Sequence, residues 1–305
     1  SRILTSLGNT QSGFGTTSLF SRGENYFLSR VKKVSANVSV ELKTNFLAGL
    51  NYSNSHIVSA APEIFSIDYF DNSQEGIKSE LVDNSAELYF LYTQNGNLFG
   101  YGVDMKVGTN IYPSFLLNYQ KGLELGAGDT NYSKLFFSYN QPLKLGKFGI
   151  LDTTFEAGKI FGDAQLSVLS PVPANQTFSL VANTFSLLNY YDFVVDQFLV
   201  GHFEHHFNGI ILNRVPLINK LKLRSLMTFR GVVGNVSDSN YAINRSTIVY
   251  NALTELYYEY GFGVANIGFG NLRIFRVDCI WRSNFTNPNN YAPNFGVRVG
   301  MSPGF

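Results

Sequence analysis

The stretch "KVSANVSVELK" at residues 33–43 has the pattern that decides the fold. Every second position is apolar and the positions between are polar or charged; the apolar set is Val34, Ala36, Val38, Val40 and Leu42. A helix would scatter these side chains around its surface, whereas successive side chains of a strand point to opposite faces. The stretch therefore predicts a long β-strand with one apolar face and one polar face.

The same alternation recurs to the end of the chain and predicts about twelve strands. They are expected near residues 33–43, 44–56, 84–94, 98–107, 111–120, 131–141, 146–161, 189–207, 219–234, 254–266, 271–285 and 294–302. Turn sequences such as "QNGN" (94–97) and "GAGDTN" (126–131) separate them, as do longer polar loops. No helical stretch and no repeat stands out, so the prediction is an all-β fold.

The composition excludes several classes of protein. Charged residues make up 15% of the 305 residues, against roughly 25% in typical globular domains, and aromatic residues also reach 15%. The net charge of +1, without a basic block, disfavours nucleic acid as a partner. A single cysteine, Cys279, excludes an internal disulfide framework and a cysteine-based zinc site. No apolar run approaches the roughly 18 residues of a membrane-spanning helix.

Strand length and the polarity of the second face favour a membrane barrel over a soluble sandwich. Several predicted strands have 11 to 19 residues, whereas globular strands most often have about 5–6 and a tilted membrane strand needs about 9–11. The apolar faces are rich in Phe and Tyr towards the strand ends, as in interfacial aromatic girdles. The opposite faces carry the charged residues Asp192, Asp196, Lys222, Arg224, Arg230, Arg276, Asp278, Arg282 and Arg298. A sandwich core could not bury this set cheaply, but the lumen of a wide barrel could hold it in water. We therefore predict a transmembrane antiparallel β-barrel in contact with membrane lipids.

Residues 160–303 resemble the C-terminal barrel of a Bacteroidota outer-membrane family whose members carry an N-terminal carboxypeptidase-regulatory-like domain. The resemblance covers "NQTFSLVANTFSLLNYYDFVVDQFLVGHFEHHFNGIILNRVPLINKLKLRSLMTFRGVVG" (175–234), and it is strongest in "GKIFG" (158–162), "FNGIILNRVPL" (207–217) and "NFGVRVG" (294–300). That TamL-like family is placed in the superfamily of the assembly barrels BamA and TamA. The resemblance implies a sixteen-stranded barrel in the bacterial outer membrane, of which this chain supplies about twelve strands.

The resemblance also implies a domain layout. Residues 33–305 would form the barrel, and residues 1–32 would be a remnant of missing strands or of a preceding domain. Residues 163–188 would form a long loop that folds into the lumen. Related barrels carry an Arg-Gly pair in that loop, but this chain has Ala174 and Asn175 at the corresponding place. Arg230, in "FRG" (229–231), is interpreted as a lumen-facing strand residue rather than as a substitute for that pair.

The function implied by the resemblance is assembly, insertion or translocation of outer-membrane proteins or surface lipoproteins. A client strand would enter at a lateral seam between the first and last strands, by β-augmentation and without covalent chemistry. Client proteins or lipoproteins, and other subunits of an outer-membrane complex, would be the partners. The last strand would form the seam, with residues Phe295, Val297, Arg298, Val299 and Met301. Two alternatives stay open: a passive pore, and a structural barrel subunit of a larger complex.

The stretch "GHFEHHFNG" (201–209) is the weak candidate for a metal site, because His202, Glu204 and His206 would share one strand face. We favour their interpretation as polar residues that line a wet lumen, with Tyr191, Phe193 and Val195 facing lipid on the same predicted strand. No serine follows the histidines at the spacing found in outer-membrane phospholipases. The glycines of "GFGVANIGFG" (261–270) open no helix, which excludes a phosphate loop. We therefore expect no enzyme activity and no cofactor.

Overall fold

The computed structural model describes residues 22, 27–71, 76–94, 98–99, 106–107, 112–126, 130–247, 251, 253, 255–270, 272–283 and 293–301. Its main feature is an antiparallel sheet of eleven strands. Each strand pairs with the strands of the sheet that come directly before and after it in the sequence. The eleven strands are β1 (Ser29–Lys43), β2 (Phe46–Ser59), β5 (Glu80–Thr93), β8 (Ser114–Gly122), β9 (Asn131–Lys144), β10 (Ile150–Asp163), β13 (Gln197–His206), β14 (Arg224–Asn235), β15 (Tyr257–Phe269), β16 (Leu272–Arg282) and β17 (Phe295–Met301). The all-β prediction is confirmed.

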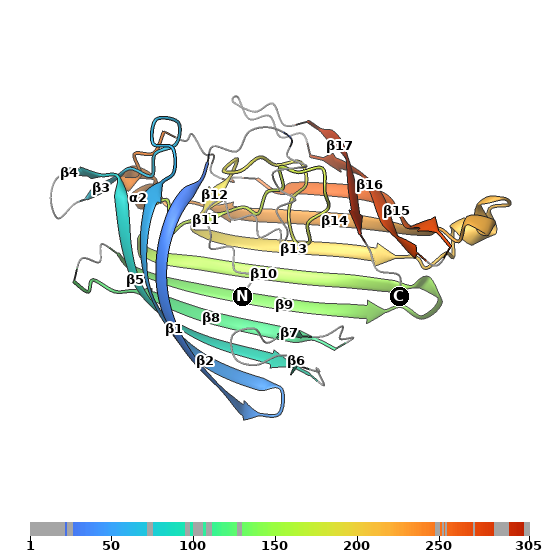
Figure 1. Ribbon diagram of the computed structural model, residues 1–305, viewed down its shortest axis with the longest axis horizontal. Helices are drawn as coiled ribbons and strands as arrows, with labels where there is room; N and C mark the ends of the chain where they lie inside the picture. Colours follow the sequence, from blue (N-terminus) through green and yellow to red (C-terminus); the bar gives the residue numbers. More distant parts are fainter. Residues whose placement is uncertain are drawn as a thin grey trace.

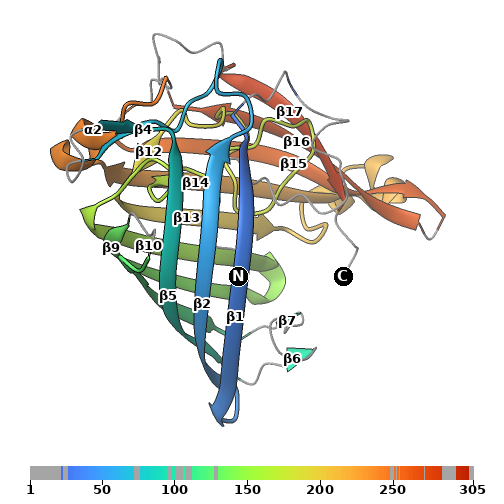
Figure 2. The same ribbon diagram turned by 60° about the vertical axis from the view of Figure 1, so that its left-hand side comes forward.

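The sheet curves strongly around an interior, with β1 and β17 as its two ends (Figure 1, Figure 2). Within the described residues, β1 pairs with β2 and β17 pairs with β16, and the two ends do not pair with each other. The described sheet is therefore a curved sheet with two edges.

The remaining elements are short. Three two-stranded pieces lie outside the main sheet: β3 (Tyr69–Asp71) with β4 (Gly76–Lys78), β6 (Leu98–Phe99) with β7 (Lys106–Val107), and β11 (Ser170–Pro171) with β12 (Val194–Val195). The helical elements are α2 (Asp238–Ile243) and the 3-10 turns η2 (Gly146–Phe148), η3 (Leu212–Arg214) and η4 (Ile218–Leu221). Among the described residues, no helix has the length and apolar character needed to cross a membrane.

The structure differs most from three of the predicted strands. The strand expected over 219–234 begins only at Arg224, after the 3-10 turn η4. The strand expected over 98–107 is not part of the main sheet, because its described ends form the hairpin of β6 and β7. The strand expected over 189–207 begins only at Gln197. Tyr191, Phe193 and Val195 are buried in the interior rather than facing outwards. The apolar alternation continues by chance across residues 189–196, since apolar residues that pack in the interior of a loop follow no strand period.

Part of the main sheet has apolar side chains on its outer face and polar side chains on its inner face. On β14, Met227, Phe229 and Val233 are exposed, whereas Thr228 and Arg230 between them are buried. A soluble sheet shows the reverse distribution. The alternation predicted from the sequence is thus present with the polar face turned towards the interior.

Aromatic rings form a continuous belt across ten neighbouring strands, from β2 to β17. Ring centroids of successive members lie 5.0–6.5 Å apart. The members in order are Phe46, Tyr92, Phe115, Tyr139, Phe155, Phe203, Phe229, Tyr258, Tyr260, Trp281 and Phe295. Offset and tilted ring pairs at these separations are favourable contacts.

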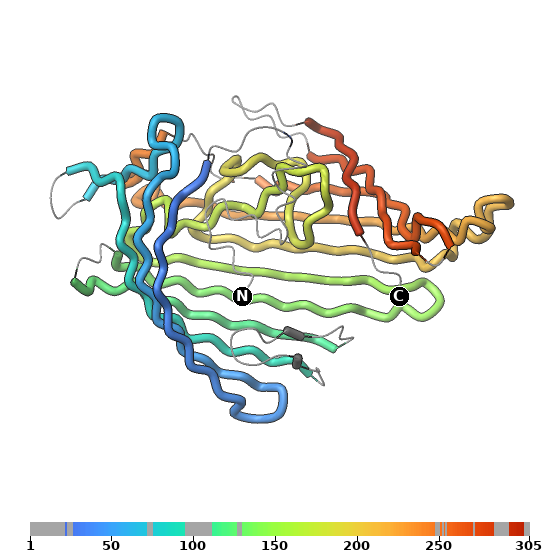
Figure 3. Tube along the Cα trace, viewed as in Figure 1, coloured from blue at the N-terminus to red at the C-terminus, as the bar shows by residue number. Residues whose placement is uncertain are grey.

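The hydrophobic core lies between the sheet and the segment that connects β10 to β13, which occupies the concave side of the sheet (Figure 3). This segment, residues 164–196, is called the plug. It contributes core residues such as Leu166, Phe185 and Phe193, and the inner face of the sheet contributes others such as Phe198 and Tyr257. The wet lumen expected from the sequence is therefore filled by apolar packing in this region.

Candidate functional site: the plug clamp and the free edge of the last strand

The two ends of the plug are tied to α2. Asn240 accepts a hydrogen bond from the backbone N–H of Ala164 (2.8 Å) at the start of the plug. The Asp196 carboxylate at its end accepts hydrogen bonds from the Asn240 amide (2.9 Å) and from the N–H of Ser237 (2.7 Å). One short helix therefore fixes both ends of the long insertion.

The middle of the plug is held by Glu259, which projects from β15. Its carboxylate accepts hydrogen bonds from the backbone N–H groups of Ser186 (2.7 Å) and Leu187 (2.8 Å), and from the hydroxyl of Tyr257 (2.8 Å). Glu259 is only 1% exposed. A buried carboxylate is costly unless such donors surround it, so the plug and this side chain stabilise each other's position.

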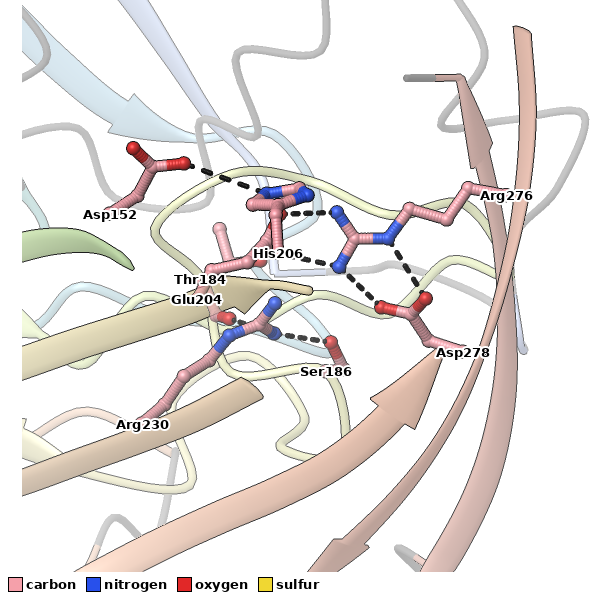
Figure 4. A network of polar contacts seen from close by, with 8 residues as sticks. All are labelled: Asp152, Thr184, Ser186, Glu204, His206, Arg230, Arg276 and Asp278. Atoms are coloured by element: carbon pink, nitrogen blue, oxygen red, sulfur yellow. Dashed lines mark hydrogen bonds and ion pairs between the residues drawn. The ribbon is translucent and has the colours of Figure 1, made fainter. Parts of the chain in front are cut away.

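Three arginines surround the same part of the plug and donate to its carbonyl groups. Arg230 of β14 donates to the Thr184 carbonyl and the Ser186 hydroxyl, both at 2.8 Å (Figure 4). Arg298 of β17 donates to the Ser186 carbonyl. Arg22 donates to the carbonyls of residues 175 (3.1 Å) and 188 (3.3 Å). Burial lowers the pKa of Arg22, and the nearby carboxylate of Glu259 opposes that shift. Glu259, Arg230, Arg298 and Arg22 are together called the plug clamp.

The plug clamp reverses the arrangement that the family resemblance implied. The resemblance implied an Arg-Gly pair in the loop, whereas here the charged groups project from the sheet and from Arg22, and the plug supplies backbone groups. Asn175, at the position of the expected Arg-Gly pair, shapes the plug itself by donating to the Ser179 carbonyl (2.7 Å) and accepting from Thr177 (2.7 Å). The loop is thus fixed without an arginine of its own.

A second set of charges, called the Arg276 network, connects β16 with β13. Arg276 makes two hydrogen bonds to the Glu204 carboxylate (2.5 and 2.7 Å) and two to the Asp278 carboxylate (2.8 and 2.6 Å) (Figure 4). His206 lies 2.8 Å from Glu204 and 3.5 Å from the Asp152 carboxylate. Since β14 and β15 lie between β13 and β16 in the sheet, these bonds connect two strands that are not neighbours.

Of the three residues of the weak metal-site candidate, Glu204 and His206 are in contact (2.8 Å) but His202 lies elsewhere. His202 is buried beside the ring of Phe185, at a centroid separation of 5.5 Å. Glu204 uses both of its oxygens on Arg276. Throughout the part of the chain that the structure describes, no group of three or more His, Cys, Asp or Glu side chains is placed to hold a metal ion.

The other predicted lumen charges fall in three environments. Asp192 and Asp196 belong to the plug rather than to a strand; the Asp192 carboxylate accepts from the N–H of residue 189 (2.8 Å). Lys222 is exposed beside η4 and Arg224, the first residue of β14, is partly buried. Arg282 is buried and donates to the Asn294 side chain (3.0 Å).

The predicted seam residues form β17, whose outer edge is contacted by the plug. Phe295, Val297, Val299 and Met301 are exposed, and Arg298 is buried among the plug clamp. The N–H of Val299 donates to the Phe178 carbonyl (2.9 Å), and the Val299 carbonyl accepts from the N–H of Leu180 (2.8 Å). This contact is a short parallel bridge.

Reasoning from the sequence did not single out Glu259, Arg22 or the contact at Val299. A signal existed for Glu259, because it alternates with apolar residues in "ELYYEYGFGV" (255–264) and so falls on the polar face. No local pattern marks a backbone contact between residues 120 positions apart.

Comparisons with known proteins found one matching family model and similarity to a solved structure. Residues 99–242 match the C-terminal domain of a family of unknown function, DUF5686. The crystal structure of BamA from Haemophilus ducreyi lacking POTRA domains 1–3 is similar, with a TM-score of 0.50 and 8% sequence identity. The similarity covers 89% of this chain and 54% of that one, so this chain spans about half the length of the BamA chain. No curated protein matches the sequence.

The chain is therefore an all-β protein with a large antiparallel sheet that resembles the fold of BamA. The match to the DUF5686 C-terminal domain runs from β6 to α2 and includes the plug and the strands β8, β9, β10, β13 and β14 of the main sheet. At 8% identity the likeness to BamA concerns the fold alone.

Proposed function

We propose that this chain is the barrel region of a non-enzymatic bacterial outer-membrane protein that assembles, inserts or translocates outer-membrane proteins or surface lipoproteins. The observation that carries the proposal is the edge of β17, whose backbone groups are not used by another strand of the described sheet. An exposed strand edge binds an incoming strand through main-chain hydrogen bonds, and side-chain pockets add selectivity.

The outer surface of the sheet supports a membrane location. Large apolar side chains are exposed on successive strands, including Leu117, Phe137, Leu199 and Phe262. Monomeric soluble proteins rarely expose apolar surface on this scale. The aromatic belt that crosses ten strands resembles the girdles that membrane barrels place at the lipid–water interface.

The filled interior favours assembly over passive transport. The plug packs apolar residues such as Phe185 and Leu188 against the inner face of the sheet, and the plug clamp fixes its backbone. A pore needs a continuous polar path, which a fixed plug obstructs.

Reconstitution in lipid vesicles tests the proposal. A urea-denatured eight-stranded outer-membrane barrel is added to vesicles with and without the protein, and its folding is followed by its altered gel mobility. The protein should accelerate folding several-fold. Val297→Pro should abolish the acceleration, because proline removes an N–H on the free edge. Val297→Ala, which keeps that N–H, is the matched control and should retain it.

Acceleration by both variants alike would contradict a role for the β17 edge. A large steady conductance without any effect on folding would instead identify a pore. In cells, loss of a single multiprotein complex on depletion, with other outer-membrane proteins intact, would identify a structural subunit.

A further inference from the structure

One edge of β17 pairs with no other strand of the described sheet, and the chain's own plug covers part of it. Alternate residues of a strand direct their backbone groups to the same neighbour. Since Val299 bonds to the plug, the N–H and C=O groups of Phe295, Val297 and Met301 face the same edge. The carbonyl of Val297 accepts a hydrogen bond from the Arg298 guanidinium (2.9 Å), which agrees with this direction. The plug segment 178–180 therefore occupies the middle of the edge at which a client strand would pair.

Two glycines on the inner face of β17 make room for the plug. A Cβ at Gly300 would lie 2.9 Å from the Cβ of Leu180, and a Cβ at Gly296 would lie 2.8 Å from a methyl group of Leu187. Both separations are closer than real Cβ contacts allow. The two glycines, which alternate with Arg298, therefore allow the plug to pack closely against this face of β17.

The segment is connected to the plug clamp on both sides. Ser179 accepts a hydrogen bond from Asn175, whose carbonyl is bound by Arg22. A few residues later, Arg298 of β17 itself donates to the carbonyl of Ser186, and Glu259 accepts from the N–H of that residue. The plug clamp therefore helps to hold the segment in its position at the edge.

We propose that residues 178–180 act as an internal substitute for a client strand, which closes the β17 edge until the plug shifts. The segment uses only the two backbone groups of Val299, whereas a longer strand would use those of all four edge residues. A longer strand can therefore replace it. This inference rests on the proposed function, because it describes the regulation of the same edge.

Hydrogen exchange of the Val299 amide tests whether the segment covers the edge. Leu180→Pro removes the N–H that bonds to Val299, and Gly300→Ala displaces the Leu180 side chain without a substitution in the plug itself. Each should accelerate exchange at Val299 by roughly tenfold in the full chain in detergent micelles. The matched controls are Ala182→Pro, at an exposed turn position, and Gly231→Ala, where a Cβ meets only ordinary contacts. Unchanged exchange in Leu180→Pro and Gly300→Ala would overturn the inference.

A reversible cross-link tests whether covering the edge regulates it. Ser179→Cys and Val299→Cys join the two bridge partners in a Cys279→Ser background. The oxidised protein should lose the acceleration of barrel folding, and reduction should restore it. Gly300→Ala should give a faster rate than the original protein. Equal rates for the oxidised and reduced forms would overturn the regulation alone, whereas failure of every form to accelerate folding would overturn the proposed function.

Discussion

At the scale of single residues, Glu259 matters most for the plug, because one carboxylate satisfies two backbone donors and a hydroxyl. Glu259→Ala leaves these donors without their acceptor and the clamp arginines without their counter-charge. We expect a loss of about 3 kcal/mol in the free energy of unfolding. Urea titration followed by gel mobility measures it. Glu80→Ala, which removes an exposed partner of His56, should cost less than about 1 kcal/mol. A similar cost for the two variants would contradict the clamp.

Arg276 is the second residue whose removal leaves buried charge unpaired. Arg276→Ala deprives both Glu204 and Asp278 of their bidentate partner, and we expect a loss of about 3–5 kcal/mol. The double variant Glu204→Ala/Arg276→Ala should lose at least about 1 kcal/mol less than the sum of the single variants. Arg273→Ala, at a partly buried arginine whose hydrogen bonds go to the backbone carbonyls of Gly270, Leu221 and Asn266, is the control. Strict additivity would show that the two side chains do not interact.

At the scale of elements, the plug decides whether the interior is open. Replacement of residues 176–188 by a short Gly-Ser linker removes the part held by Glu259 and Arg230 and keeps the ends tied to α2. In planar bilayers we expect only small, brief openings from the intact protein and a several-fold larger, steady current from the shortened chain. Ala182→Pro, which alters the plug without shortening it, should behave like the intact protein. A large current from the intact protein would contradict an obstructing plug.

At the scale of the whole molecule, the exposed apolar surface should lie in lipid. Trp281, the single tryptophan, stacks between Tyr260 and Phe295 in the aromatic belt and reports on that surface. Its fluorescence should be strongly quenched when the protein is reconstituted into vesicles of brominated lipids. The double variant Trp281→Phe/Asp238→Trp moves the probe to α2, away from the belt, and should be quenched much less. Equal quenching at the two positions would contradict the proposed placement.

Most strands of the sheet, and the face on which their side chains lie, could be predicted from the sequence. Period-two alternation is a local property, so "KVSANVSVELK" predicts its strand and the buried side of Arg230 or Arg276 follows from the neighbouring residues. The resemblance implied a loop within the lumen over 163–188, and the plug occupies that region.

Only the tertiary structure decided what holds the plug and what covers the edge. Glu259 and Ser186 lie 73 residues apart, and Val299 and Leu180 lie still further apart, so no local period relates them. Tyr191 and Phe193 continued the apolar alternation, yet packing within the plug buries them. Backbone groups are chemically alike at every residue, and which of them meet depends on how the whole chain folds.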